Sequence, residues 1–293
     1  MTLSVALDAA LILAAGQGKR MQSRRPKVVH ELAGRPMVAH VVRAARAAGA
    51  ERIVVVVGHE ADQVRAALLS EDVEFVVQAE RLGTGHAVGC ARDLLSSPPA
   101  ATLVLNGDGP LITPTTLRRL LALHASGERP ARGVTFATVE RDEPHGWGRI
   151  VRDAAGAFVA IVEEADADAE VRALREVNPG LYILGADAWD RIAALGSANA
   201  QGEMYLTDVP AATRAAGDPV RTLLLDDATE TMAANDRVEF ARLEAVVQAR
   251  LRDGWMRAGV GMRLPETVYL DDDVVLARDV LLEPSVVLKA ATT

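Results

Sequence analysis

The sequence is poor in aromatic residues and in cysteine. Phe, Trp and Tyr make up 3% of the 293 residues, so the core must be aliphatic and few side chains can stack on a nucleobase. The single cysteine, Cys90, excludes an intramolecular disulfide framework and is typical of a reducing compartment. The N-terminus also lacks the basic and apolar regions of a secretory signal. We therefore expect a cytoplasmic protein.

Long apolar runs and an excess of positive charge are also missing. No run reaches the roughly 20 residues that a membrane-spanning helix needs, so we expect no membrane insertion. The formal net charge of -8 argues against binding to a nucleic-acid polymer, although a local anionic substrate is compatible with it. Hydrophobic residues make up 49% of the chain, which is ample for the core of one large domain or two smaller ones.

Apolar runs alternate with amphipathic stretches through the first half of the sequence. The runs have the length of buried parallel strands and cover residues 5–13, 52–57, 73–78 and 102–106. The stretches between and after them predict helices at residues 36–48, 61–69, 85–95 and 114–124. This alternation predicts an α/β fold with a doubly wound, Rossmann-like sheet and right-handed crossovers. Ligands of such sheets bind beyond the carboxyl ends of the strands.

The second half has a different pattern, with short strands followed by longer helices. Strands predicted at residues 134–139, 149–152, 158–163 and 177–184 form an antiparallel, β-rich insertion. A helix at 205–216, a strand at 220–225 and a long amphipathic helix at 236–252 follow.

The C-terminal segment contains a repeat of six residues, carried by Val268, Val274, Val280 and Val286. Leucine recurs with the same period two residues after each valine. A period of six predicts the hexapeptide rungs of a β-helix, and four hexapeptides are too few for a complete solenoid. An ordinary hairpin is the alternative. We expect the acidic run 271–273 to be a solvated turn between rungs.

A cluster of positive charge follows the first predicted strand. Gly16 and Gly18 allow a tight turn, and five basic residues without an acid lie between residues 19 and 27. Arg20 stands where a Walker A loop needs Ser or Thr, and Met21 where the dinucleotide fingerprint needs Gly. The loop suits a polyphosphate, which backbone N–H groups and basic side chains can hold. A solvated basic loop is the alternative.

Two further polar residues follow predicted elements. Asp108 stands between two glycines after the fourth predicted strand, where it can offer one hard oxygen ligand to Mg²⁺, an ion that often takes only one or two ligands from protein. An ordinary turn aspartate is the alternative. Asn235 precedes the long helix; it can be an N-cap, unless Asp236 takes that role.

Residues 13–30 read L-A-A-G-x-G-x-R-M-x-S-x-x-P-K-V-x-H. This string resembles the opening of the sugar-1-phosphate nucleotidyltransferases, and in detail that of the N-acetylglucosamine-1-phosphate uridyltransferases. The resemblance implies that Arg20 and Lys27 stabilise charge on the α-phosphate and pyrophosphate. It also implies nucleotide contacts for Leu13, Ala14, Ala15 and Gly16. The family usually has Thr in place of Lys19, whose role is open.

Further strings match the same family. Those around Asp108 and Asn235 resemble its Mg²⁺-binding motifs. The string Q-x-x-x-x-G-T-G-H-A at residues 78–87 resembles its uracil-binding loop, which implies nucleotide contacts for Gln78, Gly83 and Thr84. The implied sugar-binding residues are Asn106, Gly107, Gly148, Glu163, Asn178 and Asn235. Ala165 stands where the family has Lys, and Pro179 where it has Thr or Ser, which leaves the accepted sugar open.

The resemblance also implies an organisation and a reaction. It implies a nucleotidyltransferase domain at 1–234, a linker helix at 235–258 and, at 259–293, the start of a left-handed β-helix acetyltransferase domain that is mostly absent. The implied reaction joins UTP and N-acetylglucosamine 1-phosphate into UDP-N-acetylglucosamine and pyrophosphate, with Mg²⁺, for cell-wall precursor synthesis. A homotrimer is implied only for the full-length form. Another sugar 1-phosphate, such as glucose 1-phosphate, and a non-catalytic sugar-nucleotide-binding subunit are the rivals.

Overall fold

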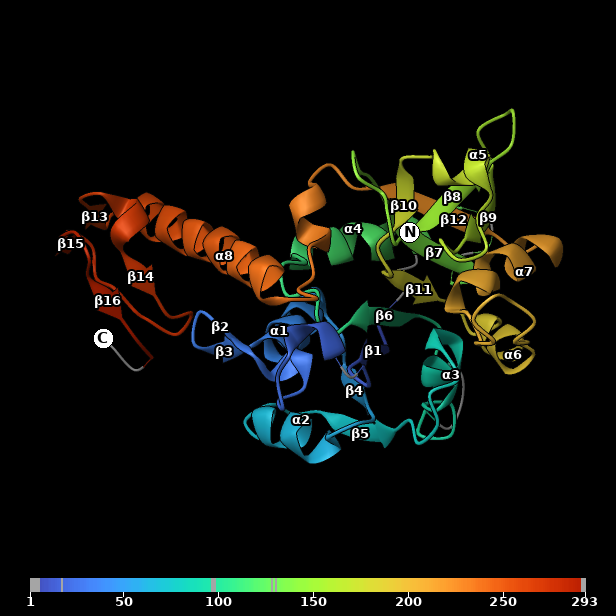
Figure 1. Cartoon of the computed structure of the whole chain (residues 1–293), viewed down its shortest axis with the longest axis horizontal. Helices are drawn as coiled ribbons and strands as arrows, with labels where there is room; N and C mark the ends of the chain where they lie inside the picture. The colour runs from blue at the N-terminus through green and yellow to red at the C-terminus, as the bar shows by residue number, and fades with distance from the viewer. Residues whose placement is uncertain (1–5, 17, 96–98, 128, 130, 291–293) are drawn as a thin grey trace.

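The computed structural model describes residues 6–16, 18–95, 99–127, 129 and 131–290, and the predicted doubly wound sheet lies at its centre (Figure 1). Four parallel strands stand in the order β5-β4-β1-β6. Their bounds are Ala9–Leu13 for β1, Arg52–Val57 for β4, Glu74–Val77 for β5 and Thr102–Asn106 for β6. The chain runs outward from β1 to β5 and then returns to the other side of β1. The reversal of strand order therefore lies between β1 and β6, where open α/β sheets bind their ligands.

Helices cover both faces of this sheet, which explains the continuous apolar runs. Along β1, Ala10 and Ile12 belong to one buried cluster and Ala9 and Leu11 to another. The first cluster includes residues of α1 (Met37–Ala48), α2 (Ala61–Ala67) and α4 (Pro114–His124). The second includes residues of α3 (Thr84–Gly89), α6 (Ala188–Ala193) and α7 (Val209–Ala215).

Four of the predicted helices end or begin elsewhere than expected; the long helix predicted to end at residue 252 continues to Arg257. The structure ends α3 at Gly89, so the prediction of a helix to residue 95 was wrong; turns follow Cys90. The helix predicted from residue 205 begins at Val209, because a short 3₁₀ turn, Leu206–Asp208, precedes α7. The helix predicted at residues 61–69 ends at Ala67.

The antiparallel strands continue the main sheet instead of forming a separate one. The order runs on from β6 as β11-β7-β10-β8-β9, and β12 pairs with β7 in parallel. The bounds are Val134–Glu140 for β7, Gly148–Arg152 for β8, Phe158–Val162 for β9, Glu176–Asn178 for β10, Tyr182–Leu184 for β11 and Val220–Leu224 for β12. A short helix, α5 (Ala169–Arg172), joins β9 to β10.

The strand predicted at residues 177–184 is interrupted. Val177 faces Val139 of β7, whereas Tyr182 faces Phe136, so five steps along one strand match only three along the other. The extra residues form a bulge around Pro179, which has no N–H to give to a ladder. Bulges of this kind are common beside active sites.

The C-terminal segment is a coil of short parallel strands at the end of the long helix α8 (Arg237–Arg257) (Figure 1). Strand β13 (Gly261–Met262) pairs with β15 (Leu281–Leu282), and β14 (Tyr269–Leu270) pairs with β16 (Val287–Leu288). Tyr269 faces Val287, which is three hexapeptides further along. The predicted hexapeptide rungs are therefore present, and the hairpin alternative was wrong; the hand of the coil stays a prediction.

A small hairpin connects this coil to the sheet. It consists of β2 (Glu31–Leu32) and β3 (Arg35–Pro36), and the N–H of Asp272 donates to the carbonyl of Ala33 at 2.9 Å. Arg35 is buried and forms ion pairs with both Asp272, at 2.8 Å, and Asp273. The acidic run 271–273 contains the predicted turn, and Asp273 is exposed; the run is not merely solvated, however, because Asp271 is buried and the other two contact the hairpin. No helix of the described part of the chain could cross a membrane.

Candidate active site

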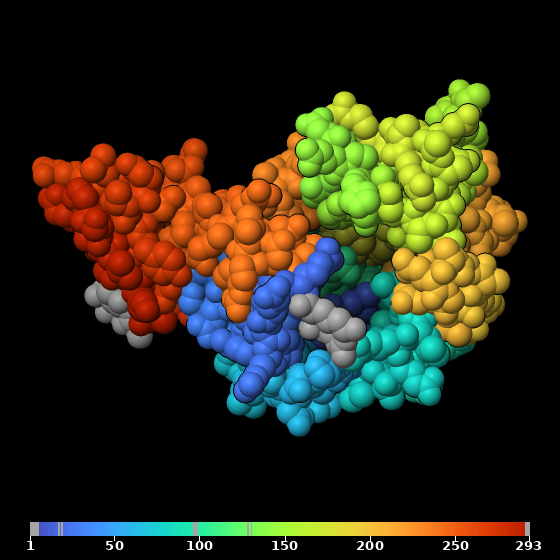
Figure 2. Space-filling view, viewed as in Figure 1, coloured from blue at the N-terminus to red at the C-terminus, as the bar shows by residue number. Residues whose placement is uncertain are grey.

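Two adjoining cavities open at the carboxyl ends of β1 and β6. The larger, of about 360 Å³, is lined by the loop after β1 and by residues around Gln78. The smaller, of about 200 Å³, is lined by strands and loops of the antiparallel part. They share Leu13, Thr84 and Asn106, and Figure 2 shows a hollow between the yellow-green and cyan parts of the surface. Two cavities that adjoin in this way have room for a ligand with two distinct parts.

A lysine, an aspartate and an asparagine from distant parts of the chain meet at the larger cavity. The ammonium of Lys27 forms an ion pair with the carboxylate of Asp108 and donates to Oδ1 of Asn235 at 3.1 Å. The side chains of Lys27 and Asp108 are 14% and 19% exposed. The structure therefore brings the cationic loop and the carboxylate to one cleft, as the sequence predicted.

The local structure holds each of these side chains in place. Gly18 has a φ of +59°, and a Cβ there would lie 2.6 Å from Cβ of Lys27, so only glycine lets the loop pack against the lysine. Asp236 accepts from the N–H groups of Val238 and Glu239 and so caps α8. Asn235 is therefore not needed as a cap and keeps its amide for the cleft.

The same two oxygens fit a divalent metal. Oxygens of Asp108 and Asn235 converge on one cation, the Lys27 ammonium, and both are hard ligands of the kind that Mg²⁺ prefers. Among the described residues, no three His, Cys, Asp or Glu side chains gather as in a protein-only metal cage. This matches an ion that completes its coordination with water and phosphate oxygens.

The loop after β5 closes the other side of the larger cavity. Gln78 is buried and donates through Nε2 to the carbonyl of Gly83 at 3.1 Å. A Cβ on Gly83, with its φ of +109°, would lie 2.5 Å from the carbonyl oxygen of Met204. The N–H of Leu206 donates to Oγ1 of Thr84 at 3.1 Å. The loop is thus fastened to residues 204–206, of which Leu206 also lines the smaller cavity.

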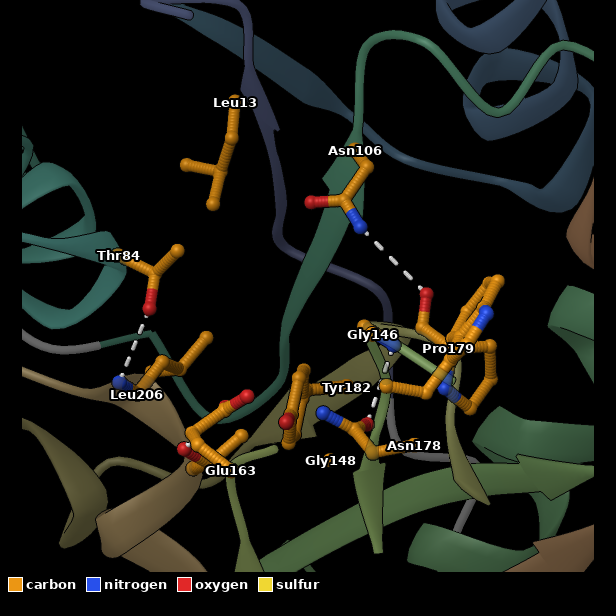
Figure 3. Close-up of a pocket in the computed structure, with 13 residues that line it drawn as sticks. Leu13, Thr84, Asn106, Gly146, Gly148, Glu163, Asn178, Pro179, Tyr182 and Leu206 are labelled. Carbon is orange, nitrogen blue, oxygen red and sulfur yellow. Dashed lines mark hydrogen bonds between the residues drawn. The ribbon is translucent and has the colours of Figure 1, made fainter. Parts of the chain in front are cut away.

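The smaller cavity carries one carboxylate and several neutral polar groups (Figure 3). Oε1 of Glu163 accepts from the hydroxyl of Thr207 at 2.8 Å. Asn178 accepts from the N–H of Gly180 at 3.0 Å, and Asn106 donates to the carbonyl of Pro179 at 3.4 Å. The bulge thereby presents a carbonyl, an amide and a glycine to the cavity.

Burial sets the titration of the groups around this cavity. It raises the pKa of the Glu163 carboxyl above its usual value, with further repulsion from nearby acids such as Asp166. Burial also raises the pKa of the Tyr182 phenol. Asp208, beside Thr207, has a raised pKa for the same two reasons, burial and Asp166. Burial and mutual repulsion thus raise the pKa of the carboxyl groups in and beside this cavity.

Most of the residues predicted for the site line one of the two cavities. The larger is lined by Leu13, Ala14, Ala15, Gly16, Lys27, Gln78, Gly83, Thr84, Asn106 and Asp108; Gly148, Glu163 and Asn178 line the smaller. Asn235 reaches the site through Lys27, and the buried turn at Gly107 donates its N–H to the carbonyl of Leu13 at 2.9 Å. Arg20 is exposed and lines neither cavity. The side chain of Lys19 lies outside the described part of the chain.

Further residues line the cavities beyond those predicted one by one. The string 201–208, which contains Glu203 and Thr207, also resembles a family string that lines the sugar pocket, whereas Arg81, Trp147 and Tyr182 were not predicted to line the site. Arg81 and Glu203 line the larger cavity, and Trp147, Tyr182 and Thr207 line the smaller. The guanidinium of Arg141 lies 4.3 Å from the ring centroid of Trp147. Only their places inside the matched strings could have marked Arg81, Trp147, Glu203 and Thr207, because which of these side chains face the cavity depends on the fold.

Comparisons with known proteins agree with this geometry. A family model described as the MobA-like NTP transferase domain matches residues 10–207. The bifunctional protein GlmU of Syntrophotalea carbinolica is 44% identical over 97% of this chain and 61% of its own length. That of Cutibacterium acnes is 44% identical over 98% of this chain and 70% of its own length.

The chain spans about three fifths of the length of several of these relatives, 61% and 63% for two of them. Among solved structures, a UDP-glucose pyrophosphorylase complexed with UDP-glucose superposes with a TM-score of 0.67. It covers 83% of this chain at 18% identity. At that identity the likeness shows the fold alone.

Proposed function

Because this chain belongs to the GlmU family and carries its MobA-like NTP transferase domain, as the motifs predicted, we propose that it is a uridylyltransferase. It forms UDP-N-acetylglucosamine and pyrophosphate from UTP and N-acetylglucosamine 1-phosphate. The observation that carries this proposal is the meeting of Lys27, Asp108 and Asn235 beside two joined cavities.

Each cavity suits one substrate. UTP occupies the larger, with its phosphates along the loop 13–16 and Lys27 and its base against Gln78, Gly83 and Thr84. The sugar occupies the smaller, where Gly148, Glu163 and Asn178 bind its hydroxyls and N-acetyl group. The shared lining at Leu13 and Asn106 is where the two phosphates meet.

The reaction needs positioning and charge neutralisation more than proton transfer. The phosphate of the sugar 1-phosphate is already an anion, so no side-chain base is required for its in-line attack on the α-phosphorus of UTP. Lys27 leaves Asp108 for the phosphates and neutralises the charge that develops on them, and Arg20 contributes from the exposed turn. Asp108 and Asn235 would hold Mg²⁺, which supplies Lewis-acid neutralisation of the phosphate oxygens.

A pyrophosphate-release assay with purified protein tests the proposal. UTP, N-acetylglucosamine 1-phosphate and Mg²⁺ together should give pyrophosphate, and omission of any one should abolish it. Faster release with glucose 1-phosphate would favour the rival sugar, for which Ala165 and Pro179 leave room. Release at background with every sugar 1-phosphate would instead support a non-catalytic sugar-nucleotide-binding subunit.

The wider context is part of the same proposal. We place the nucleotidyltransferase domain at 1–234, the linker helix at 235–258 and the beginning of the β-helix at 259–293. The product would feed cell-wall precursor synthesis in the cytoplasm, and a homotrimer would form through the β-helix of a full-length protein. Sedimentation of this chain measures its own oligomeric state.

A further inference from the structure

The side-chain amide of Gln78 has both of its hydrogens engaged. Its Nε2 lies 3.1 Å from the carbonyl oxygen of Gly83 and 3.1 Å from Nδ1 of His86. A carbonyl oxygen can only accept, so it is the nitrogen of the amide that faces Gly83. The same nitrogen then donates its second hydrogen to His86. Gln78 has no donor left for a ligand and can offer only Oε1.

The tautomer of His86 follows from the same contact. Nδ1 must accept from Gln78, so the ring proton of the neutral imidazole is on Nε2. Nε2 lies 3.8 Å from the sulfur of Cys90, which is a weak acceptor. His86 stands on α3, one turn from Cys90, and does not line either cavity. It therefore acts on a ligand only through Gln78.

We propose that His86 is a positioning residue that fixes the Gln78 amide so that the nucleotide cavity reads the imide N–H of uracil. The inference rests on the proposed function, since Gln78 lines the larger cavity. Oε1 of Gln78 accepts from N3–H of uracil or thymine. Cytosine has a lone pair at the same ring position, which would face the lone pairs of Oε1. With cytosine bound, Oε1 of Gln78 would be shielded from water without a donor. The cost of such an unpaired acceptor is what makes hydrogen-bonding sites reject the wrong ligand.

Two amide substitutions of His86 separate the contact from a merely structural role. In His86→Asn the amide group lies near the position of Nδ1, so its oxygen can accept from Nε2 of Gln78. In His86→Gln the amide group lies near the position of Nε2, so it can contact Cys90 but not Gln78. His86→Asn should keep the ratio of kcat/KM for UTP over CTP within about threefold of the unsubstituted chain. His86→Gln should lower that ratio about tenfold, the size expected for the loss of one hydrogen bond.

The measurements are the kcat/KM ratio for UTP, dTTP and CTP, the KM for the sugar 1-phosphate, and the melting temperature. The KM for the sugar 1-phosphate should stay unchanged in both variants. The substitutions should change kcat/KM for dTTP in the same direction as for UTP, because thymine also has an N3–H. In a Gln78→Ala background the two variants should no longer differ, because the amide that His86 holds is gone.

The inference would be overturned if His86→Asn and His86→Gln had equal ratios of kcat/KM for UTP over CTP. It would also be overturned if the change in this ratio only followed the loss of melting temperature in each variant. If a variant is too slow for kinetics, calorimetric binding of UTP and CTP gives the same ratio. Absence of UTP-dependent pyrophosphate release in the unsubstituted chain would instead contradict the proposed function. The two failures are therefore distinguishable.

Discussion

Two clusters in this molecule join a basic residue near the N-terminus to acidic or amide groups more than 200 positions away. In the cleft, Lys27 contacts Asn235, 208 positions later, as well as Asp108. At the coil, Arg35 contacts Asp272, 237 positions later. The cleft cluster borders a cavity of about 360 Å³. At the coil cluster, the hairpin 31–36 packs directly against the acidic run. A similar pairing of charges thus borders a cavity in one place and joins the coil to the hairpin in the other.

The difference lies in what surrounds the charges. At the coil, the carboxylate of Asp271 packs directly against Gly34. A Cβ added to Gly34 would lie 2.5 Å from Cγ of Asp271, so the coil cluster leaves no room for a ligand. Lys27, in contrast, lines a cavity together with residues 13–16. Substitutions in the cleft should therefore remove activity and spare stability, and substitutions at the coil should do the reverse.

The largest effect should come from the cleft. Asp108→Ala or Lys27→Ala should lower turnover by about a thousandfold or more, because Asp108 would hold Mg²⁺ and Lys27 would neutralise charge on the reacting phosphates. The free energy of unfolding should change by less than about 1 kcal/mol: although the two side chains are only 14% and 19% exposed, both line the larger cavity, where water can solvate the partner that remains. Pyrophosphate release and thermal unfolding, measured on the same preparations, check both halves. Near-normal kinetics in either variant would show that the substituted residue does not have the proposed role in catalysis.

Arg35→Ala should give the opposite profile. The guanidinium is buried but its partners Asp272 and Asp273 are 30% and 52% exposed, so the loss should be about 2 kcal/mol, below the value for a fully buried pair. Turnover should stay within about twofold, and hydrogen exchange should rise in residues 31–36 and 268–274. Arg263→Ala is the matched control, because its pair with Glu283 is exposed. A large loss of turnover with normal stability would show that the coil contact is part of the catalytic machinery.

Glu163 combines features of both clusters, since it is largely buried like Arg35 yet borders a cavity like Asp108. Glu163→Gln should raise the KM for the sugar 1-phosphate about tenfold, the cost of one charge-assisted hydrogen bond, and leave that for UTP unchanged. Burial raises the pKa of the Glu163 carboxyl, so its stabilising contribution is present below the unfolded pKa and is lost as pH rises through the folded pKa.

The pH dependence of unfolding tests the raised pKa of Glu163 independently of the kinetics. Glu163→Gln should be the more stable chain at pH 8, where the native carboxylate is charged, and the difference should disappear toward pH 4. Thermal unfolding across this range measures it. A difference of the opposite sign would mean that the carboxylate is stabilised in the folded chain by a partner other than Thr207.

The sequence predicted the cleft cluster but not the coil cluster, for a physical reason. The doubly wound pattern brings the loop after β1 and Asp108, after β6, to one edge of the sheet, whereas the places of Lys27 and Asn235 in the site were implied by the family resemblance. Strands β4 and β6 and helix α4 lie where the apolar runs and the Pro114 start placed them. The acidic run 271–273 gave no such signal, because its burial depends on how a hairpin far away in the chain docks. The interruption at Pro179 is different, because Pro179 and Gly180 are residues that break strands and the predicted strand 177–184 ran through them.

The smallest effect should come from Asp236, which belongs to the helix that links the two clusters. Its carboxylate caps α8 through the N–H groups of Val238 and Glu239, so Asp236→Ala should cost about 1 kcal/mol of stability. Asn235 stays anchored by its N–H, which donates to Glu239 at 2.6 Å, and turnover should fall only about threefold. Asp236→Asn, which keeps a capping oxygen, is the control. If Asp236→Ala instead lowered turnover as far as Asp108→Ala, the helix start would have to be counted within the cleft, and the two clusters would be one coupled unit along α8.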